Sequence, residues 1–423
     1  MSPKGLELSL KPNIRHDFPI FSKEGDYASL VYLDSAASSQ KPAVVIQALT
    51  DFYQNSYANI RRGLYDLSLK ATEKLEKTRA RLGSFVGAKD EYVTVFVRGA
   101  TEALNLLAHT YGGSKIGPGD EILITEMEHH ANLLPWQYVA ETRGAVLKIA
   151  RIDSTQRLDL QHFMDQISPK TRLAAFTHVS NVLGTINPVQ HMVDQLRERG
   201  IPTIIDGCQA APCMPLDLAQ LGCSAYTFSA HKMLGPTGVG ALFLRKEFAQ
   251  DLPPYHRGGG MLMMADYQHA RYLPPPQRFE AGTPALAEIT AFHHALDYLD
   301  DLGLNAILQH EQDLADQLIG KLKAMDGVRI FGPPKAQDRI GVVSFALEDV
   351  HPHDAGMFLS QQGICVRVGH HCAQPLMRKL DAVATIRASA YVYNDPAEID
   401  QLVEALENCR EYFRMRSAGP EGV

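Results

Sequence analysis

Cys372 stands in the stretch VRVGHHCAQP, residues 366–375, where two histidines abut it and Arg367 precedes them. These residue types are compatible with a metal ligand, a reactive thiol or a buried turn. A structural zinc ion takes four ligands, commonly from C-x2-4-C or H-x3-5-H pairs, and adjacent His370, His371 and Cys372 lack that spacing. We therefore predict no metal site. Arg367 and the histidines would instead supply positive charge that favours a thiolate, which makes Cys372 a candidate nucleophile.

Lys232 is the second candidate for chemistry. It lies between an apolar run and a glycine-proline turn in YTFSAHKMLGPTG, residues 226–238. In an open α/β sheet, ligands bind at the carboxyl ends of the strands, so Lys232 is expected at a crevice. Lysines are mostly exposed, and a surface loop is the other interpretation of this residue alone. Asp206 ends another apolar run, where it would either face the same crevice or cap the next helix.

A candidate anion site follows a third apolar run, in VFVRGATEALNLL, residues 95–107. Free N–H groups at the start of this helix would suit a phosphate, although simple capping by Thr101 is the alternative. Together, these three features specify pyridoxal phosphate as the ligand. The helix start would bind its phosphate, the carboxylate of Asp206 would face its protonated ring nitrogen, and the amine of Lys232 would react with its aldehyde. We therefore predict that Lys232 holds this cofactor as a Schiff base.

Seven short apolar runs, rich in β-branched residues, alternate with helix-sized stretches between residues 92 and 244. Runs that are apolar throughout and separated by helices predict an α/β fold, with a mostly parallel, seven-stranded sheet covered by helices on both faces. The runs are YVTVFV (92–97), EILIT (121–125), AVLKIA (145–150), RLAAFTHV (172–179), PTIID (202–206), AYTFS (225–229) and VGALFL (239–244), and helices are expected over 101–111, 129–143, 159–168 and 188–199.

The pattern changes near residue 286 to a long helical repeat up to about 325, then short β runs and a closing helix over 395–416. This predicts a smaller α+β domain. The expected division is an N-terminal segment, 1–30, that packs with the small domain, a large cofactor-binding domain, 31–285, and a small domain, 286–423, that carries the cysteine loop. The Gly- and Pro-rich segment 256–284 has no long regular element, which is typical of functional or disordered segments.

Composition narrows the class of protein. The 423 residues carry a formal net charge of −7 without a long Lys/Arg run, so we expect no nucleic-acid partner. No stretch approaches the roughly 18 uninterrupted apolar residues of a membrane span, and the N-terminus lacks the apolar core of a signal peptide. The six cysteines form neither a CxxC pair nor a compact framework, which favours reduced thiols and the cytoplasm.

Taken together, the motifs resemble one family. The chain is similar to type II, SufS-like and CsdA-like cysteine desulfurases, which are fold-type-I pyridoxal-phosphate enzymes of the class-V aminotransferase family. The likeness runs from YLDSAASSQKP (32–42) to RASAYVYN (387–394). The matches lie in the family's order and are EHHANLLPWQ (128–137), HVSNVLGT (178–185), DGCQA (206–210), SAHKMLGPTGVG (229–240), FEAGTP (279–284) and RVGHHCAQP (367–375).

The resemblance implies a role for each matching residue. For the cofactor, these are Lys232 as the Schiff-base lysine, Asp206 beside the pyridine nitrogen, Gln209 on the ring oxygen, His129 stacked on the ring as a catalytic imidazole, and Thr101, Ser229 and His231 on the phosphate. For the substrate, they are Arg387 on the carboxylate with Asn181 beside it, and Arg367 in the cysteine loop. Taken alone, His129 would equally cap the following helix, and Arg387 would equally form a structural ion pair.

The implied reaction converts L-cysteine to L-alanine and leaves the sulfur on Cys372 as a persulfide. The family further implies a homodimer, in which Thr283 reaches the phosphate across the interface, and a SufE-like or SufU-like protein that accepts the sulfur for iron–sulfur cluster assembly. One alternative keeps the fold and acts on L-selenocysteine, as a selenocysteine lyase, or is another pyridoxal lyase or epimerase. An alternative of another class is a sulfur carrier or scaffold without turnover.

Five residues depart from the family pattern. Arg61 and Tyr65 stand where histidines are usual, Ala100 replaces a threonine, Cys208 an alanine and Ala230 a glycine. Arg61 adds a permanent cation that we expect near the entry of substrate or partner. Cys208 is expected to be a small packed residue, with a second thiol near the cofactor as the other interpretation.

Overall fold

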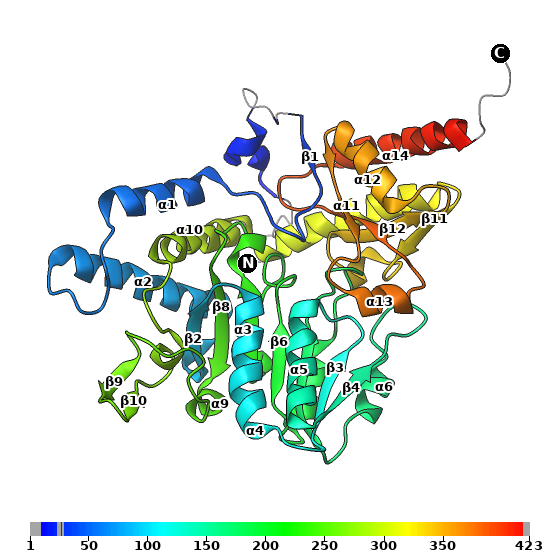
Figure 1. Ribbon diagram of the computed structural model, residues 1–423. Helices are drawn as coiled ribbons and strands as arrows, with labels where there is room; N and C mark the ends of the chain where they lie inside the picture. The colour runs from blue at the N-terminus through cyan, green and yellow to red at the C-terminus, as the bar shows by residue number, and fades with distance from the viewer. Residues whose placement is uncertain (1–9, 23–26, 28, 418–423) are drawn as a thin grey trace, which may run out of the picture.

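A seven-stranded sheet forms the body of the molecule in the computed structural model, which describes residues 10–22, 27 and 29–417 (Figure 1). Its strand order is β2-β8-β7-β6-β5-β3-β4, and only the pairs that β8 makes with β2 and β7 are antiparallel. The strands are β2 (Tyr92–Val97), β3 (Glu121–Thr125), β4 (Val146–Ala150), β5 (Thr171–Thr177), β6 (Thr203–Asp206), β7 (Ala225–Ser229) and β8 (Gly240–Arg245). The predicted α/β class and all seven predicted strands are confirmed.

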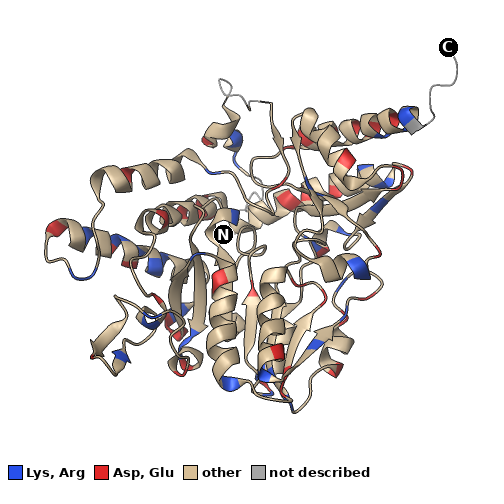
Figure 2. Cartoon of the chain, in the orientation of Figure 1, with Lys and Arg blue, Asp and Glu red and all other residues tan. Residues whose placement is uncertain are grey.

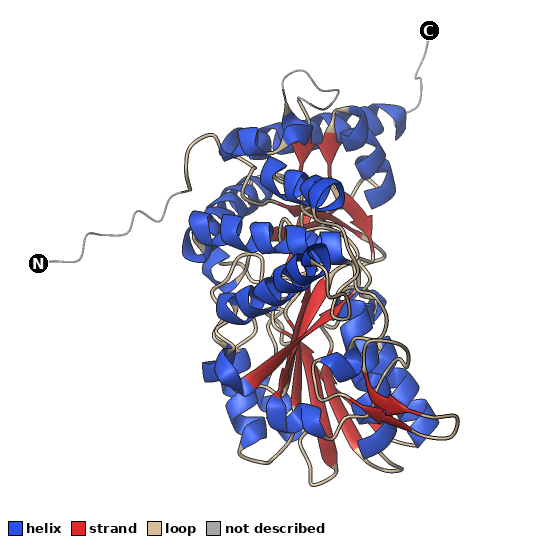
Figure 3. Cartoon of the chain, turned by 90° about the vertical axis from the view of Figure 1, so that its left-hand side faces the viewer, coloured by secondary structure: helices blue, strands red, loops and turns tan. Residues whose placement is uncertain are grey.

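Both faces of this sheet are buried over its central strands, as their apolar sequences require, whereas the edge strand β4 is partly exposed. In β5, Leu173 and Ala175 pack into one apolar cluster, while Ala174 and Phe176 pack into the cluster on the opposite face. Figure 3 shows the twisted strands with helices on both sides. The helices of this part are α1 (Ala43–Asn55), α2 (Asp66–Phe85), α3 (Ala100–Leu107), α4 (Gly113–Lys115), α5 (Leu134–Arg143), α6 (Leu160–Asp165), α7 (Val189–Arg197), α8 (Leu218–Leu221), α9 (Lys246–Gln250) and α10 (Leu286–Leu302).

A second, antiparallel sheet lies in the C-terminal part of the chain, in the order β11-β12-β15-β14. Its strands are β11 (Val328–Phe331), β12 (Val342–Leu347), β14 (Arg367–Gly369) and β15 (Thr385–Ser389), and β13 (Ile364–Cys365) pairs separately with β1 (Val31–Tyr32). The helices here are α11 (Leu304–Lys323), α12 (Pro352–Gln361), α13 (Gln374–Lys379) and α14 (Pro396–Ser417). The parallel β1–β13 pair attaches the beginning of the described chain to its C-terminal part.

Short helical turns complete the connections. They are η1 (Ile14–Asp17), η2 (Pro19–Phe21), η3 (Lys89–Glu91), the π-helical η4 (Ala108–Gly112), η5 (His130–Asn132), η6 (Ala230–Lys232), η7 (Gln277–Phe279) and η8 (Ala336–Asp338).

In two segments the structure differs in detail from the prediction. The helical pattern from 286 to 325 is interrupted at Gly303, whose φ of 81° ends α10 before α11 begins. The segment 256–284 contains a short antiparallel hairpin, β9 (Leu262–Ala265) and β10 (Ala270–Tyr272). Neither change alters the predicted architecture.

The described part of the N-terminal segment packs against the C-terminal part of the chain. Arg15 forms a 2.6 Å ion pair with Glu398. The buried ring of Phe18 lies 4.9 Å from the ring of Tyr393 and 6.1 Å from that of Tyr298, between centroids. The expected packing of the whole segment 1–30 with the small domain stays a prediction, and its residues 1–9, 23–26 and 28 lie outside the described residues. The division into domains at 31 and 286 stays a prediction.

Basic and acidic side chains intermingle along α2 and α14 in Figure 2. In the part of the chain that the structure describes, no helix combines the length and apolar character that crossing a membrane requires.

Replacing Phe18 tests the role of the N-terminal segment. Because its ring is 1 % exposed, Phe18→Ala is expected to lower the free energy of unfolding by about 3–5 kcal/mol. Tyr27→Ala, which truncates a side chain that is 54 % exposed, should change it by no more than about 0.5 kcal/mol. Urea unfolding followed by circular dichroism measures both. Equal stability of the two variants would show that the N-terminal segment does not contribute to the hydrophobic core.

Candidate active site

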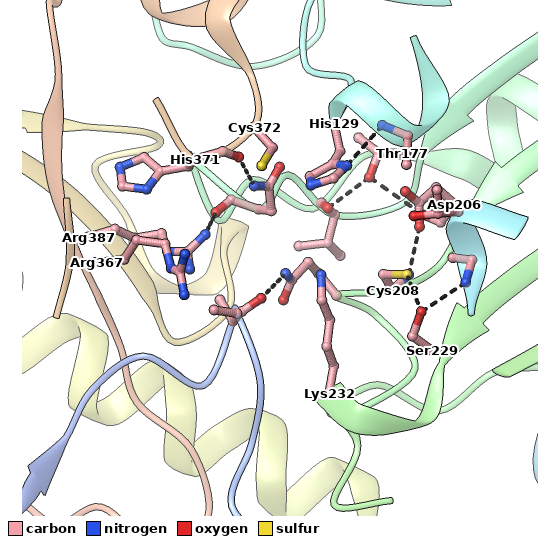
Figure 4. A pocket seen from close by; sticks show the side chains of 18 of the residues that line it. His129, Thr177, Asp206, Cys208, Ser229, Lys232, Arg367, His371, Cys372 and Arg387 are labelled. Atoms are coloured by element: carbon pink, nitrogen blue, oxygen red, sulfur yellow. Dashed lines mark hydrogen bonds between the residues drawn. The ribbon is translucent and has the colours of Figure 1, made fainter. Parts of the chain in front are cut away.

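A cavity of about 340 Å³ lies where the two sheets meet. The large sheet contributes the carboxyl ends of β5, β6 and β7, and the small sheet contributes β14, β15 and the cysteine loop. Figure 4 shows the labelled side chains converging from these two sources. Every predicted site residue except Thr283 lines this cavity, namely Thr101, His129, Asn181, Asp206, Gln209, Ser229, His231, Lys232, Arg367, Cys372 and Arg387.

Adjacent strand ends position Asp206 and Lys232. Asp206 is the last residue of β6 and is 6 % exposed, and its Oδ1 accepts a 3.0 Å hydrogen bond from the backbone N–H of Cys208. Lys232 ends the short turn η6 that follows β7. Because β6 and β7 are parallel neighbours, the carboxylate and the amine reach the cavity from the same edge of the sheet. Gln209 is fixed nearby through a 2.8 Å bond from its Nε2 to the carbonyl of Ala36.

The start of α3 forms the predicted anion site. Gly99 precedes the helix without a side-chain cap, and the N–H of Ala100 donates a 2.9 Å hydrogen bond to Oγ of Ser229. Simple capping by Thr101 is therefore not what the structure shows, since Thr101 lies in the first helical turn. The first N–H groups of an α-helix have no partners within the helix, and the helix dipole favours an anion there. Cys208 is buried against this site, with its Sγ 3.9 Å from Oγ of Ser229.

His129 both caps a helical turn and faces the cavity, which are the two roles that the sequence left open. Its Nδ1 accepts a 3.0 Å hydrogen bond from the N–H of Ala131, so it caps the η5 turn, and its ring also lines the cavity. Burial, reinforced by the charge of Lys232, lowers the pKa of His129 to about 4. The neutral ring therefore carries its proton on Nε2, which leaves an N–H as its second polar group.

The cysteine loop is held against the large sheet by three hydrogen bonds. The N–H of His130 donates to the carbonyl of Cys372 at 2.7 Å, and Nδ2 of Asn181 donates to the carbonyl of His371 at 2.8 Å. The N–H of Gln374 donates to Nε2 of His130 at 3.2 Å. Within this loop His371 and Cys372 have φ angles of 52° and 56°, an uncommon conformation for residues other than glycine. The thiol of Cys372 is exposed.

One expectation about this loop is wrong. His371 does not supply positive charge to Cys372, because burial, followed by the charge of Arg387, lowers its pKa to about 3. Its Nε2 is 2.7 Å from Oγ1 of Thr385, which anchors the ring inside the small sheet. The cations beside the thiol are instead the guanidinium groups of Arg367 and Arg387.

Asp34 is the site residue that the sequence analysis missed. Its carboxylate accepts hydrogen bonds from Nη2 of Arg387 at 3.1 Å and from Nη2 of Arg367 at 2.9 Å. The expected structural ion pair of Arg387 thus exists alongside its position in the cavity. Asp34 lay within the motif YLDSAASSQKP, and an acidic residue flanked by neutral ones was the only available signal.

Thr283 and Arg61 lie together in a different place. Both line a separate cavity of about 460 Å³, and Thr283 also lines one of about 700 Å³. Arg61 does not line the central cavity, because Nη2 of Arg61 pairs with Oε2 of Glu280 at 2.8 Å. Glu280 also holds Arg79 at 2.6 Å. The structure thus accounts for Arg61 as a partly buried ion-pair partner of Glu280.

Comparison with known proteins assigns the family. Residues 31–402 match the family model of class-V aminotransferases. The chain belongs to the class-V aminotransferase family. It is 43% identical to a probable cysteine desulfurase of Halalkalibacterium halodurans, covering 95% of this chain and 98% of that protein, and 43% identical to a cysteine desulfurase of Escherichia coli, covering 93% and 97%. Among solved structures, the apo cysteine desulfurase of Thermococcus onnurineus superposes with a TM-score of 0.90 at 34% identity, covering 95% and 98%.

Class-V aminotransferases of the cysteine desulfurase type use pyridoxal phosphate, and the cavity fits this cofactor. The unpaired N–H groups of α3 and the hydroxyl of Ser229 suit its phosphate. The buried carboxylate of Asp206 suits a protonated ring nitrogen, and the amine of Lys232 suits its aldehyde. Nε of Arg387, buried and without a hydrogen-bond partner among the described residues, remains for a further anionic group.

His178, next to Asp206 on the neighbouring strand, gives a pH test. Burial lowers its pKa to about 4, and the unfolded chain binds the proton first, at about 6.5. Folding is therefore disfavoured as the pH falls through this interval, by about 1.4 kcal/mol per pH unit for this one group. His178→Gln cannot titrate, so the stability of the wild type relative to this variant should fall by about 3 kcal/mol between pH 6.5 and 4. Urea unfolding across that range measures it, and parallel stability curves would contradict the assignment.

The exposure of the cysteines gives a second test. Cys372 is exposed, Cys365 is half-buried, and the other four cysteines are buried. Brief treatment of the folded chain with iodoacetamide at neutral pH should modify Cys372 first and at least about tenfold faster than any other cysteine. Mass spectrometry of peptides identifies the site. Rapid modification of Cys208 would show that the cavity is more open than its burial implies.

Proposed function

We propose that this chain is a pyridoxal-phosphate-dependent cysteine desulfurase, which converts L-cysteine to L-alanine and keeps the sulfur on Cys372 as a persulfide. The observation that carries this proposal is that Cys372 and Lys232, which lie 140 positions apart and on different sheets, line one cavity. The names of the close relatives support the same reaction.

Large-domain residues would hold the cofactor. Lys232 would bind its aldehyde, Asp206 would keep its ring nitrogen protonated, and Gln209 would donate to its ring oxygen. His129 would stack on the ring, while Thr101, Ser229 and His231 would hold the phosphate. When bound, pyridoxal phosphate supplies an electron sink for negative charge that develops on the amino acid.

Residues of both sheets would bind the substrate. Arg387 would bind the α-carboxylate of the substrate. It lies next to Asn181, because Nη1 of Arg387 donates a 2.9 Å hydrogen bond to the carbonyl of Asn181. Lys232 would take up the α-proton once its amine is free. Arg367 lies at the exposed end of the same arginine pair and would complete the carboxylate site.

Sulfur transfer balances without another reactant. The thiolate of Cys372 forms a bond to the sulfur of the bound cysteine while that sulfur's bond to the β-carbon breaks. The electron pair passes to the carbon side, and the β-carbon gains a proton to become the methyl group of alanine. The neutral Nε2–H of His129, whose ring lines the same cavity, would orient these groups.

We further propose a homodimer. On α1, on α2 and between them, at the left of Figure 1, the chain exposes a concentration of large apolar side chains, which is typical of a protein–protein interface. They are Val44, Ile46, Tyr53, Tyr57, Leu64, Tyr65, Leu67 and Leu69. Thr283, remote from the central cavity of its own chain, would reach the phosphate of the second subunit.

The sulfur would leave on a protein acceptor of the SufE-like or SufU-like kind, for iron–sulfur cluster assembly. The exposed thiol of Cys372 supports this, because an acceptor could reach it without opening the fold. All six cysteines are free, which suits a chain that works among reduced thiols in the cytoplasm.

Turnover of L-cysteine tests the function directly. The purified wild type with pyridoxal phosphate should form alanine and persulfide sulfur in equal amounts, and Cys372→Ser should reduce sulfur transfer at least about 100-fold. Cys365→Ser, a control on the neighbouring strand, should stay within about threefold of the wild type. Borohydride should fix the cofactor on the wild type but not on Lys232→Ala. A wild type that forms no alanine, or fixes no cofactor, would refute the proposal.

A further inference from the structure

The register of the small sheet places two arginines directly opposite each other. Arg367 on β14 and Arg387 on β15 are paired residues of an antiparallel ladder, so their side chains emerge on the same face. Like charges in this arrangement repel each other. The guanidinium of Arg387 is also almost fully buried, with 2 % of its side chain exposed, whereas 49 % of that of Arg367 is exposed.

One carboxylate neutralises this repulsion. Oδ1 of Asp34 is 3.1 Å from Nη2 of Arg387 and 3.2 Å from Nε of Arg367, and Oδ2 is 2.9 Å from Nη2 of Arg367. Asp34 therefore bridges the two guanidinium groups rather than serving one of them. Two positive charges and one negative charge leave the cluster with a single positive charge.

The backbone fixes Asp34 in this position. It bridges to Ser389 on β15, the residue after next from Arg387, and the N–H of Ser35 donates to the carbonyl of Ser389 at 3.2 Å. The N–H of Ser389 in turn donates to the carbonyl of Leu33 at 2.7 Å. The backbone of Asp34 is thus anchored on both sides, and its carboxylate is held by the two guanidinium groups, so its charge is part of the site.

We propose that Asp34 is the built-in counter-ion of the substrate-carboxylate site and determines its specificity by fixing the net charge of the arginine pair at one positive. A cluster with this charge matches an amino acid with one carboxylate, while the positive charge of Arg367 is already matched by Asp34. This inference rests on the proposed function only in assigning the α-carboxylate to Arg387. Asp34 acts through the arginines and is a positioning residue.

Removing the charge of Asp34 should therefore change which amino acids bind. Asp34→Asn keeps the size and one acceptor oxygen but leaves two positive charges, which favours a ligand with two carboxylates. We expect the binding preference for L-aspartate over L-alanine to rise about tenfold relative to the wild type. Arg367→Gln leaves no net charge and should shift the preference about tenfold in the opposite direction.

The experiment uses the cofactor-loaded full chain. Titration with sodium L-aspartate and with L-alanine, followed by the cofactor absorbance and by the midpoint of thermal unfolding, gives both dissociation constants for each variant. KM and kcat for L-cysteine are measured in parallel, and the effect of Asp34→Asn should appear in KM more than in kcat. The double variant Asp34→Asn/Arg367→Gln restores one positive charge, so its preference should return to within about threefold of the wild type.

Asp349→Asn is the matched control. Asp349 also holds two arginines, Arg410 and Arg414, each with Nε at 3.0 Å, but neither of them lines the central cavity, whereas Arg367 and Arg387 both do. Asp349→Asn should lower stability without changing ligand preference.

An unchanged preference in Asp34→Asn, or a change that the double variant does not reverse, overturns the proposal. If Asp34→Asn fails to fold, an unchanged preference in Arg367→Gln overturns it equally. Absence of alanine formation by the wild type is a separate result that refutes only the proposed reaction.

Discussion

The hydrogen bonds between the cysteine loop and the large sheet are the constraint on which the site depends. Lys232 is fixed by the seven-stranded sheet and Cys372 by a loop of the small sheet, so nothing in either sheet alone brings the two together. The 2.7 Å bond from His130 to the carbonyl of Cys372 and the 2.8 Å bond from Asn181 to that of His371 make this connection. They also explain why the loop keeps left-handed φ angles, since relaxing the backbone would turn both carbonyls away from their donors.

Charge in this molecule is organised around shared carboxylates. Asp34, Glu280 and Asp349 each form ion pairs with two arginines. In each case the negative charge of the carboxylate offsets the repulsion between two guanidinium groups. Arg339 shows the alternative. It is fully buried and bonds to the carbonyls of Phe331, Pro333 and Val342, and burial lowers its pKa to about 10. Backbone oxygens accept hydrogen bonds from all three of its side-chain nitrogens, which suits a buried arginine in a structural position.

Local signals in the sequence predicted the fold, whereas most of the site residues came from the resemblance to a known family. Each strand of the large sheet is a mostly apolar run, and Asp206 at the end of one run and Lys232 just after another were predictable from chain order. Asp34 was not, because its two partners are more than 330 positions away and only the register of β14 and β15 brings them together. The break at Gly303 is similarly invisible to a periodicity that continues on both sides of it.

The titration of the histidines shows why residue type alone misjudges a site. His370 and His371 were expected to add positive charge beside Cys372, yet burial lowers the pKa of His371 to about 3, and that of His129 and His231 to about 4. These rings are neutral at physiological pH, so the permanent cations beside the thiol are Arg367 and Arg387. A histidine pair would lose or gain charge within the working pH range, whereas guanidinium groups keep theirs. A carboxylate site built on arginines, with one fixed counter-ion, therefore holds its net charge constant while protons move on the substrate beside it.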